Sequence, residues 1–255
     1  MIRLLQIEFQ KIWKNRSSKI LSIAYFVILS FIALIASIKF NIGTFELHIA
    51  DQGIFNFPYI WHFNTYIAAI LKFFLAIVIV SMMANEYSYG TLKQNLIDGL
   101  SKKEFIQSKF LTVVVFALAS TVFVFFMSLI LGISFSSYNE IDIIFSDLEY
   151  IIAYFVKLVA FFSFCLFLGI LVKRSAFAIG FLFIWNIIEG IIIGVLRWKV
   201  FKGTDNYQYI TQFLPLESMS NLIKEPFTRL SVIKNIETTI GGEVAAKDYG
   251  VHWFS

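Results

Sequence analysis

Residues 85–104 read NEYSYGTLKQNLIDGLSKKE and form a compact polar stretch between two long apolar segments. Thr91 and Gln94 have the spacing of a capping box, in which each side chain bonds to a backbone amide left unpaired at a helix start. We therefore expect a helix to begin at Leu92. Three leucines of this helix fall on one face and give it an apolar ridge: Leu92, Leu96 and Leu100.

The same stretch also contains a stop signal and a second start signal. Gly99 can end the first helix, since glycine readily takes the left-handed conformation found just after helix ends. Ser101 and Glu104 repeat the capping-box spacing, which predicts a new helix from Lys102 into the next apolar segment. The sequence thus predicts a helix of about two turns held between two longer ones.

The composition indicates the surroundings of this short helix. Hydrophobic residues make up 58% of the 255 residues and only 15% are charged, and the mean hydropathy is +0.77. Such values exceed those of soluble domains, so we predict an all-α polytopic membrane protein. Five apolar runs are long enough to cross a bilayer as helices: 19–38, 64–84, 107–133, 150–172 and 176–196.

The charges that flank these runs predict an orientation. Basic residues gather before the first run (Arg3, Lys11, Lys14, Arg16, Lys19), between the second and third (Lys93, Lys102, Lys103, Lys109) and between the fourth and fifth (Lys173, Arg174). The segment between the third and fourth runs has no Lys or Arg and four acidic residues: Glu140, Asp142, Asp147 and Glu149. By the positive-inside rule, the amino terminus and residues 85–105 are cytoplasmic.

Two further segments suggest interfacial roles. Ahead of the first run, apolar side chains share one face of a helix that we expect to lie in the cytoplasmic headgroups: Ile2, Leu5, Phe9, Ile12 and Trp13. A generic membrane anchor would show the same pattern. Aromatic residues alternate at Phe55, Phe57, Tyr59, Trp61 and Phe63, which favours an interfacial belt over a strand.

The sequence lacks the residues that disulfides, Cys-based metal sites and P-loop nucleotide hydrolysis require. The single Cys165 can form neither an intrachain disulfide nor a Cys-based metal site. The three histidines, His48, His62 and His252, flank apolar runs separately, and we assign them ordinary interfacial roles. No Gly-x-x-x-x-Gly-Lys-Ser/Thr loop occurs, so the chain cannot itself be a nucleotide-hydrolysing subunit of that type.

Three charges fall within the predicted spans. Lys72, Lys157 and Glu189 would each lie about 10 to 12 Å below the outer surface at roughly 1.5 Å per helical residue. Opposite charges at one depth suggest a salt bridge with one snorkelling lysine. Alternatively, these residues line a substrate path or bind an ion. Beside them, Gly190 and Gly194 have the spacing that lets another helix approach closely.

The chain resembles the permease subunit of a bacterial type-2 ATP-binding-cassette exporter. The resemblance rests on the amphipathic start, the two spans and the motif Asn85-Glu86-Tyr87-x-x-Gly90-Thr91-Leu92-Lys93. The resemblance covers residues 1–230 in layout and is motif-like over 85–105. It implies that a coupling helix between spans 2 and 3 docks on a separate ATPase. The residues implied in coupling are Glu86, Gly90, Thr91, Leu92, Asn95 and Leu96, with Glu86 in ionic contact with the ATPase.

The resemblance also implies partners and a location. ATP and Mg²⁺ would bind to the ATPase, this chain would need no cofactor of its own, and a second permease copy, identical or paralogous, would complete the pathway in the bacterial inner membrane. Nucleic acid is not an expected partner. The family usually has six spans, whereas residues 231–255 are too polar to cross and would be external; either this chain is shortened or a sixth span lies outside it. The alternative function is a membrane-embedded enzyme that uses Glu189 and an intramembrane lysine on a lipid or peptide.

Overall fold

A computed structural model describes residues 2–37, 40–42, 45–47, 53–138, 140–202, 204–227 and 250–251. The elements, in chain order, are α1 (Ile2–Lys14), α2 (Arg16–Ser37), β1 (Phe40–Ile42), β2 (Phe45–Leu47), α3 (Tyr59–Ile70), α4 (Lys72–Ser88), α5 (Thr91–Ile97), α6 (Lys102–Phe135), α7 (Ile141–Ile144), α8 (Glu149–Val172), α9 (Ser175–Val195), the π-helical η2 (Leu196–Val200), the 3₁₀-helical η3 (Asp205–Tyr207), α10 (Gln208–Thr211) and α11 (Pro215–Asn221).

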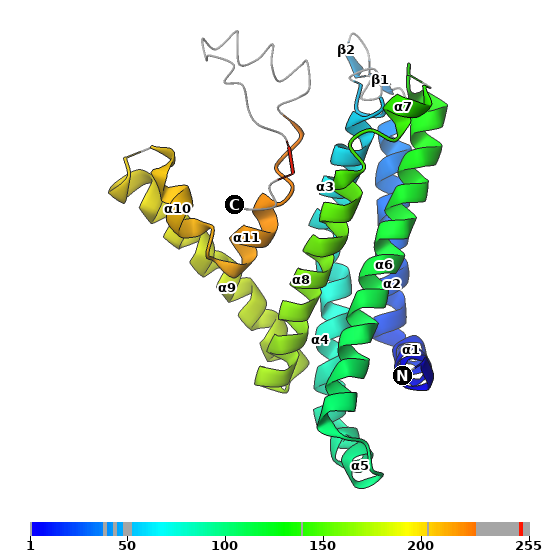
Figure 1. The fold of residues 1–255 in the computed structure, drawn as a ribbon, viewed down its shortest axis with the longest axis vertical. Coiled ribbons are helices and arrows are strands. Elements are labelled where there is room, and N and C mark those ends of the chain that lie inside the picture. Colours follow the sequence, from blue (N-terminus) through cyan, green and yellow to red (C-terminus); the bar gives the residue numbers. More distant parts are fainter. Residues whose placement is uncertain are drawn as a thin grey trace.

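The long helices run side by side as a bundle, with α4 packed against α8 and α2, and α6 packed against α8 (Figure 1). We name its two ends after the short helices beside them, the α5 end and the α7 end. β1 and β2 pair in a small antiparallel hairpin, so the described chain is otherwise helical. α9 leans away from α8 toward the α7 end, and α11 packs against both of them (Figure 1).

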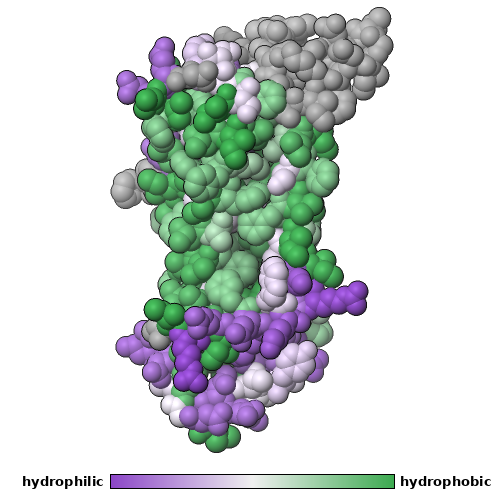
Figure 2. All heavy atoms as spheres, turned by 90° about the vertical axis from the view of Figure 1, so that its right-hand side faces the viewer, coloured by the Kyte–Doolittle hydropathy of each residue, from purple (hydrophilic) through white to green (hydrophobic). Residues whose placement is uncertain are grey.

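The apolar helices make this a multi-pass helical membrane protein. Among the described residues, four helices are long and apolar enough to cross a bilayer, and α3 with α4 makes a fifth if that pair, bent by 45°, is one span. Figure 2 shows the consequence: apolar side chains cover the length of the bundle, and hydrophilic ones gather at the α5 end. The five predicted runs correspond to α2, α3 with α4, α6, α8 and α9.

The sharp turn between α1 and α2 has a local cause. The side-chain oxygen of Asn15 accepts hydrogen bonds from the amides of Ser17 (3.0 Å) and Ser18 (3.2 Å) at the start of α2. This is the bonding of an N-cap residue, which satisfies amides that the helix itself cannot pair. The chain can therefore end α1 and start α2 in a new direction within one residue.

The short helix α5 exists, but its predicted N-terminal capping box is wrong. α5 begins at Thr91, one residue earlier than expected, and follows Gly90, whose φ of 70° is left-handed; no side-chain capping bond is made there. The hydroxyl of Thr91 instead donates to the Glu86 carboxylate. The Glu86 carboxylate favours this bond, because a charged acceptor makes a stronger hydrogen bond than a neutral one.

The end of α5 and the start of α6 are as predicted. Gly99 has a φ of 95°, and the amides of Gly99 and Leu100 donate to the carbonyls of Leu96 (3.3 Å) and Asn95 (3.0 Å). These two bonds form a Schellman motif. Two residues on, Ser101 and Glu104 form both bonds of a capping box. The chain between α5 and α6 is thus closely defined by hydrogen bonds.

The aromatic alternation near the α7 end is not an interfacial belt. Phe55, Phe57 and Trp61 are almost fully buried, and only Tyr59 of the five is exposed. The Trp61 ring stacks on Phe125 with 5.4 Å between centroids, and its indole nitrogen donates to the Ile144 carbonyl at 2.9 Å. These rings fill the interior where α3, α6 and α7 meet.

The remaining expectations from the sequence concern the region after α9, which the structure describes only in part. The region after α9 contains α11, which begins with Pro215 at its first turn. This placement suits proline, since the first-turn amide needs no helical partner. The polar segment 231–255 lies outside the described residues except for 250–251, and so do His48 and His252.

Candidate functional site

Four charged side chains from three helices meet at the α5 end, and we call them the charge cluster: Glu8, Lys11, Glu86 and Lys109. The Lys109 ammonium lies 2.5 Å from a Glu8 oxygen and 2.6 Å from a Glu86 oxygen. The Lys11 ammonium lies 2.7 Å from the same Glu86 oxygen and 3.4 Å from the other Glu8 oxygen. Two positive and two negative charges are thus matched within hydrogen-bonding distance.

The cluster is buried. The Lys109 side chain is 0% exposed and that of Glu86 is 3% exposed, whereas Lys11 reaches the surface with 39%. Burial removes water from these charges at a cost of several kcal/mol per ion, which is recovered only if partners satisfy them closely. Here the four carboxylate oxygens of Glu8 and Glu86 all have a donor, the last being the Thr91 hydroxyl.

Each helix contributes to the cluster for a local reason. Glu8 lies on the inner face of α1 beside the buried Ile12, and Phe9 stacks on Phe116 of α6 with 5.5 Å between ring centroids. Glu86 is in the last turn of α4, and Lys109 is in the second turn of α6. The cluster therefore joins α1, α4 and α6 where these helices approach one another.

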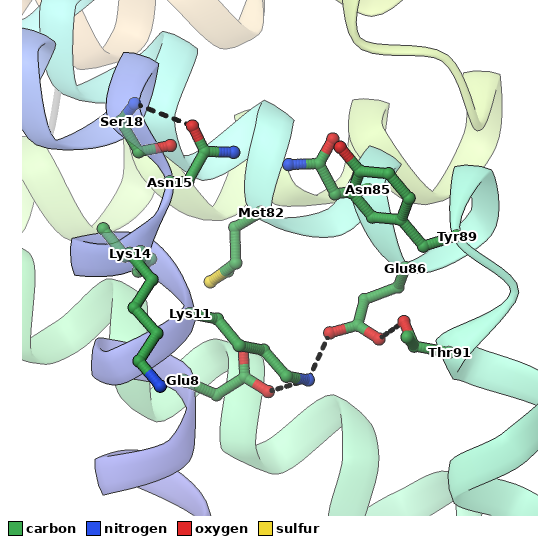
Figure 3. A pocket seen from close by; sticks show the side chains of 11 residues that line it. Glu8, Lys11, Lys14, Asn15, Ser18, Met82, Asn85, Glu86, Tyr89 and Thr91 are labelled. Carbon is green, nitrogen blue, oxygen red and sulfur yellow. Dashed lines mark hydrogen bonds and ion pairs between the residues drawn. The ribbon is translucent and has the colours of Figure 1, made fainter.

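A pocket of about 370 Å³ opens next to the cluster, between the α1–α2 turn and the end of α4. Figure 3 shows Glu8 and Lys11 on α1 facing Glu86 across it, with Thr91 bonded on the far side of Glu86. Burial by itself would lower the pKa of Lys11, but the hydrogen bond to Glu86 and the charges of Glu8 and Glu86 outweigh it and raise that pKa above its ordinary value of 10.5. Lys11 is therefore charged at neutral pH.

α5 projects from this cluster and has no buried residue. Of the predicted coupling residues, Gly90 is exposed, whereas Thr91, Leu92, Asn95 and Leu96 are half-buried. Ile97 is 84% exposed. Glu86 differs from the expectation, because its carboxylate points inward to the cluster and not outward to a partner. The exposed part of α5 is instead made of Lys93, Gln94, Ile97 and Asp98.

The three charges predicted within the spans are not joined in an ion pair. Both oxygens of Glu189 accept bonds from the start of α11: the Leu216 amide lies at 3.2 and 3.1 Å and the Glu217 amide at 3.0 Å. The Trp185 indole donates to the same carboxylate at 2.5 Å. A carboxylate is favoured at a helix N-terminus, where unpaired amides carry partial positive charge. Glu189 thus secures α11 and needs no lysine.

The two lysines lie elsewhere. The Lys157 ammonium donates to the Ser220 carbonyl at 3.2 Å, and that of Lys72 lies 4.3 Å from the centre of the Phe161 ring. Both line one pocket of about 230 Å³. The predicted close helix contact at Gly190 and Gly194 is also absent among the described residues, since open space surrounds the position of an added Cβ at each.

Sequence reasoning missed three of the four members of the charge cluster. Glu8 was assigned no role, and Lys11 and Lys109 were used only as flanking cations. A signal was present, because Glu8 lies three residues after Leu5 and four before Ile12, on the apolar face of α1. A carboxylate on such a face needs a buried partner.

Other residues that could carry chemistry are dispersed. His62 is buried, stacks on Tyr150 with 4.5 Å between centroids and bonds to the Lys224 carbonyl at 2.8 Å, which places it inside the bundle and not at the interface. Cys165 is also buried. In the described part of the chain, no three His, Cys, Asp or Glu side chains form a group that could hold a metal ion.

Residues 25–225 match the family described as "Protein of unknown function (DUF2705)", and the chain belongs to this family. The match runs from within α2 to beyond α11 and includes Glu86 and Lys109, whereas Glu8 and Lys11 precede it. No curated protein and no solved structure matches the chain. The family description names no activity, so function is argued from the geometry.

Proposed function

We propose that the chain is the transmembrane permease subunit of an ATP-driven exporter, coupled to a separate ATPase through residues 85–105. The observation that carries this proposal is the attachment of α5. This two-turn helix has no buried residue, yet its first residue, Thr91, is bonded to Glu86, and Glu86 is paired with charges on α1 and α6. A load applied to α5 would therefore reach three helices at once.

The geometry suggests separate roles for the coupling residues. The exposed side chains of α5, above all Ile97, would contact the ATPase. Thr91 and Glu86 would pass the movement of α5 to the bundle, in place of the ionic contact expected of Glu86. The Schellman motif at Gly99 holds the end of α5 and the capping box at Ser101 holds the start of α6. They support this role, because helix ends whose free backbone groups are bonded do not fray.

The proposal includes an orientation and an assembly. The α5 end would face the cytoplasm of a bacterial cell, as the basic residues near it favour, and ATP with Mg²⁺ would bind to the partner. The α1 helix would lie in the headgroups, with Trp13, which is 57% exposed, at the interface. A second permease copy, identical or paralogous, would pack on the open face of α9 where Gly190 and Gly194 leave space.

The enzyme alternative has less support. It needs Glu189 as an acid or base, but both oxygens of this carboxylate already accept backbone amides. A proton-transfer group has to reach its substrate within hydrogen-bonding distance. Glu189 is better explained as an anchor of α11.

Co-purification from native membranes is the first test. We expect a soluble subunit with ATPase activity to accompany the chain at a fixed ratio, and addition of the chain to raise its ATP hydrolysis. Activity of the isolated chain on a lipid or peptide, with no such subunit bound, would contradict the proposal.

Paired variants test the docking surface. Ile97→Asp places a charge on the exposed face of α5, and Ile141→Asp does the same on α7 at the opposite end, where Ile141 is 72% exposed. We expect Ile97→Asp to release the ATPase while Ile141→Asp retains it. Equal retention by both variants would remove α5 as the docking element.

A further inference from the structure

The pocket that holds Lys72 and Lys157 lies among α3, α4, α8, α9 and α11, away from the charge cluster. Among the described residues, its other polar groups come from Tyr66, Asn186 and Ser220, no Asp or Glu lines it, and the remaining lining is apolar. Two lysines therefore face one small space to which no described residue contributes a carboxylate.

Neither lysine has a described carboxylate as an ion-pair partner. Lys157 is only 3% exposed, and its side chain donates a hydrogen bond to the neutral Ser220 carbonyl. Lys72 lies over the rings of Phe161 and Phe73, at 4.3 and 5.9 Å from their centres. Aromatic faces attract a cation but do not neutralise its charge.

Two carboxylates lie nearby, and neither forms an ion pair with these lysines. Glu189 is bonded to the α11 amides and to Trp185. The charge of Glu217 acts on Lys157, but no ion pair joins the two. Charged residues within membrane spans pair with one another or with backbone carbonyls, or face a polar cavity. An anion in the pocket would supply the charged partner that no described residue gives these lysines.

We propose that this pocket binds a single anionic oxygen group, a phosphate or a carboxylate, carried by an amphipathic molecule. Lys72 and Lys157 would hold the oxygens from two sides, and Asn186 and Tyr66 would supply further hydrogen bonds. Lysine serves as a compact point charge for phosphate and carboxylate groups. The surrounding aromatic and aliphatic side chains would contact the first carbons of the ligand.

The size of the pocket limits what enters. A volume of about 230 Å³ is below the range of roughly 300–1,000 Å³ usual for sites that enclose a whole drug-sized ligand. It corresponds to about eight water molecules at roughly 30 Å³ each, which is enough for a headgroup. On the pocket lining, Ile70 is 53% exposed, so the apolar tail would leave along the surface of the bundle. This site does not depend on the proposed coupling to an ATPase.

Equilibrium binding to the purified chain in an uncharged detergent tests the site. The probes are dioctanoyl phosphatidylglycerol, octanoate and inorganic phosphate, with dioctanoylglycerol as the control that has the same tails and no anionic group. We expect phosphatidylglycerol or octanoate to bind at least about tenfold more tightly than dioctanoylglycerol, since hydrogen bonds to charged groups typically contribute that much or more.

The lysine variants decide whether binding occurs in this pocket. Lys72→Gln and Lys157→Gln should each weaken binding of the preferred probe by about tenfold or more, and Lys72→Arg should retain this binding. Lys93→Gln, on the exposed face of α5, is the matched control and should change nothing. Because Lys72 is only half-buried, its Gln and Arg variants decide the matter even if Lys157→Gln does not fold.

The outcomes also separate the sources of the anion. Competition by inorganic phosphate alone would identify a small free anion as sufficient, whereas binding of only the tailed probes would identify an amphipathic ligand. Equal binding of phosphatidylglycerol, octanoate and dioctanoylglycerol would overturn the proposal. Full retention of the anionic probes by Lys72→Gln would overturn it as well. Either negative result would leave the proposed coupling role of α5 unaffected.

Discussion

Two regions of this molecule bury the same residue types in opposite ways. At the α5 end, Glu8, Lys11, Glu86 and Lys109 match charge with charge, and every carboxylate oxygen has a donor. Between α8, α9 and α11, the charges are separated: Glu189 takes backbone amides, and the lysines share a pocket without a described anion. The first arrangement is complete within the chain, and the second is not.

The difference indicates different roles. A saturated cluster has one favoured geometry, so it fixes helices relative to one another and suits the transmission of movement. A pocket with unneutralised cations has a free energy that an anionic ligand can lower, so it suits binding. In the absence of ligand, a substitution that removes one charge should therefore lower the stability of the fold strongly in the cluster and only slightly in the pocket.

Lys109→Met should have the largest effect on stability. The side chain is fully buried, and its removal leaves the buried Glu8 and Glu86 with an excess of negative charge. Breaking a buried ion pair by removing one partner typically costs about 3–5 kcal/mol. Thermal or denaturant unfolding in detergent should show this loss.

A second variant separates charge imbalance from lost packing. Adding Glu8→Gln to Lys109→Met restores the balance of charges, since Lys11 and Glu86 remain as a pair. We expect the double variant to be more stable than Lys109→Met alone. If it is less stable by the sum of the two single losses, the four residues do not act as one cluster.

Glu189→Gln should have the next largest effect, through α11. The variant replaces a charged acceptor of three hydrogen-bond donors by a neutral amide, and hydrogen bonds to charged groups contribute about 1.5–3 kcal/mol. Trp185→Phe removes one of these donors, so the two substitutions should be non-additive. Protection of the α11 amides from hydrogen exchange reports the loss directly. Strict additivity would contradict the shared carboxylate.

Features fixed by neighbours in the chain could be predicted from the sequence, and features fixed by distant residues could not. Local signals succeeded where neighbours in the chain supply the partners, as at Ser101 with Glu104 and at Gly99. The prediction at Thr91 failed because its hydroxyl donates to Glu86 and makes no capping bond, and this bond depends on where Glu86 is held. The orientation of Glu86, in turn, depends on Lys109, 23 residues away.

Long-range partners were the least predictable feature. The apolar runs predicted the membrane helices because a length of about twenty apolar residues is set by the bilayer alone. They could not predict which charges would meet, since helices can pack in several rotations and only side-chain fit selects one. Glu189 illustrates this: two lysines at a similar predicted depth were its obvious partners, and the amides of Leu216 and Glu217 took their place.

Thr91→Ala tests the link between α5 and the charge cluster. It removes the hydroxyl that donates to Glu86 and should cost about 1 kcal/mol, the usual net contribution of one hydrogen bond. Thr91→Ser keeps the hydroxyl and is the matched control. If α5 transmits movement, Thr91→Ala should retain the bound ATPase and lose its stimulation. Unchanged stimulation would make the Thr91–Glu86 bond a purely local feature.

Lys72→Met contrasts directly with Lys109→Met. Because no described carboxylate pairs with Lys72, its removal leaves no buried negative charge behind, and the thioether keeps contact with Phe161. We expect stability in ligand-free detergent to be unchanged within about 1 kcal/mol, or higher. A loss comparable to that of Lys109→Met would mean that Lys72 has an internal counterion.

The smallest effect concerns the pH dependence of Lys11, the most exposed member of the cluster. Its folded-state pKa is raised above 10.5 by Glu86 and Glu8 despite partial burial, so the charged form favours the folded state. This contribution is fully present below the unfolded pKa of about 10.4 and is lost as the pH rises through the folded value.

The stability difference between the wild type and Lys11→Met should therefore stay constant from pH 7 to about pH 10 and shrink above that. Because the side chain is 39% exposed, solvent screens its charge and the difference itself should be small. A difference that already shrinks between pH 7 and about pH 9 would show that Lys11 is not held in the charged form by the two carboxylates.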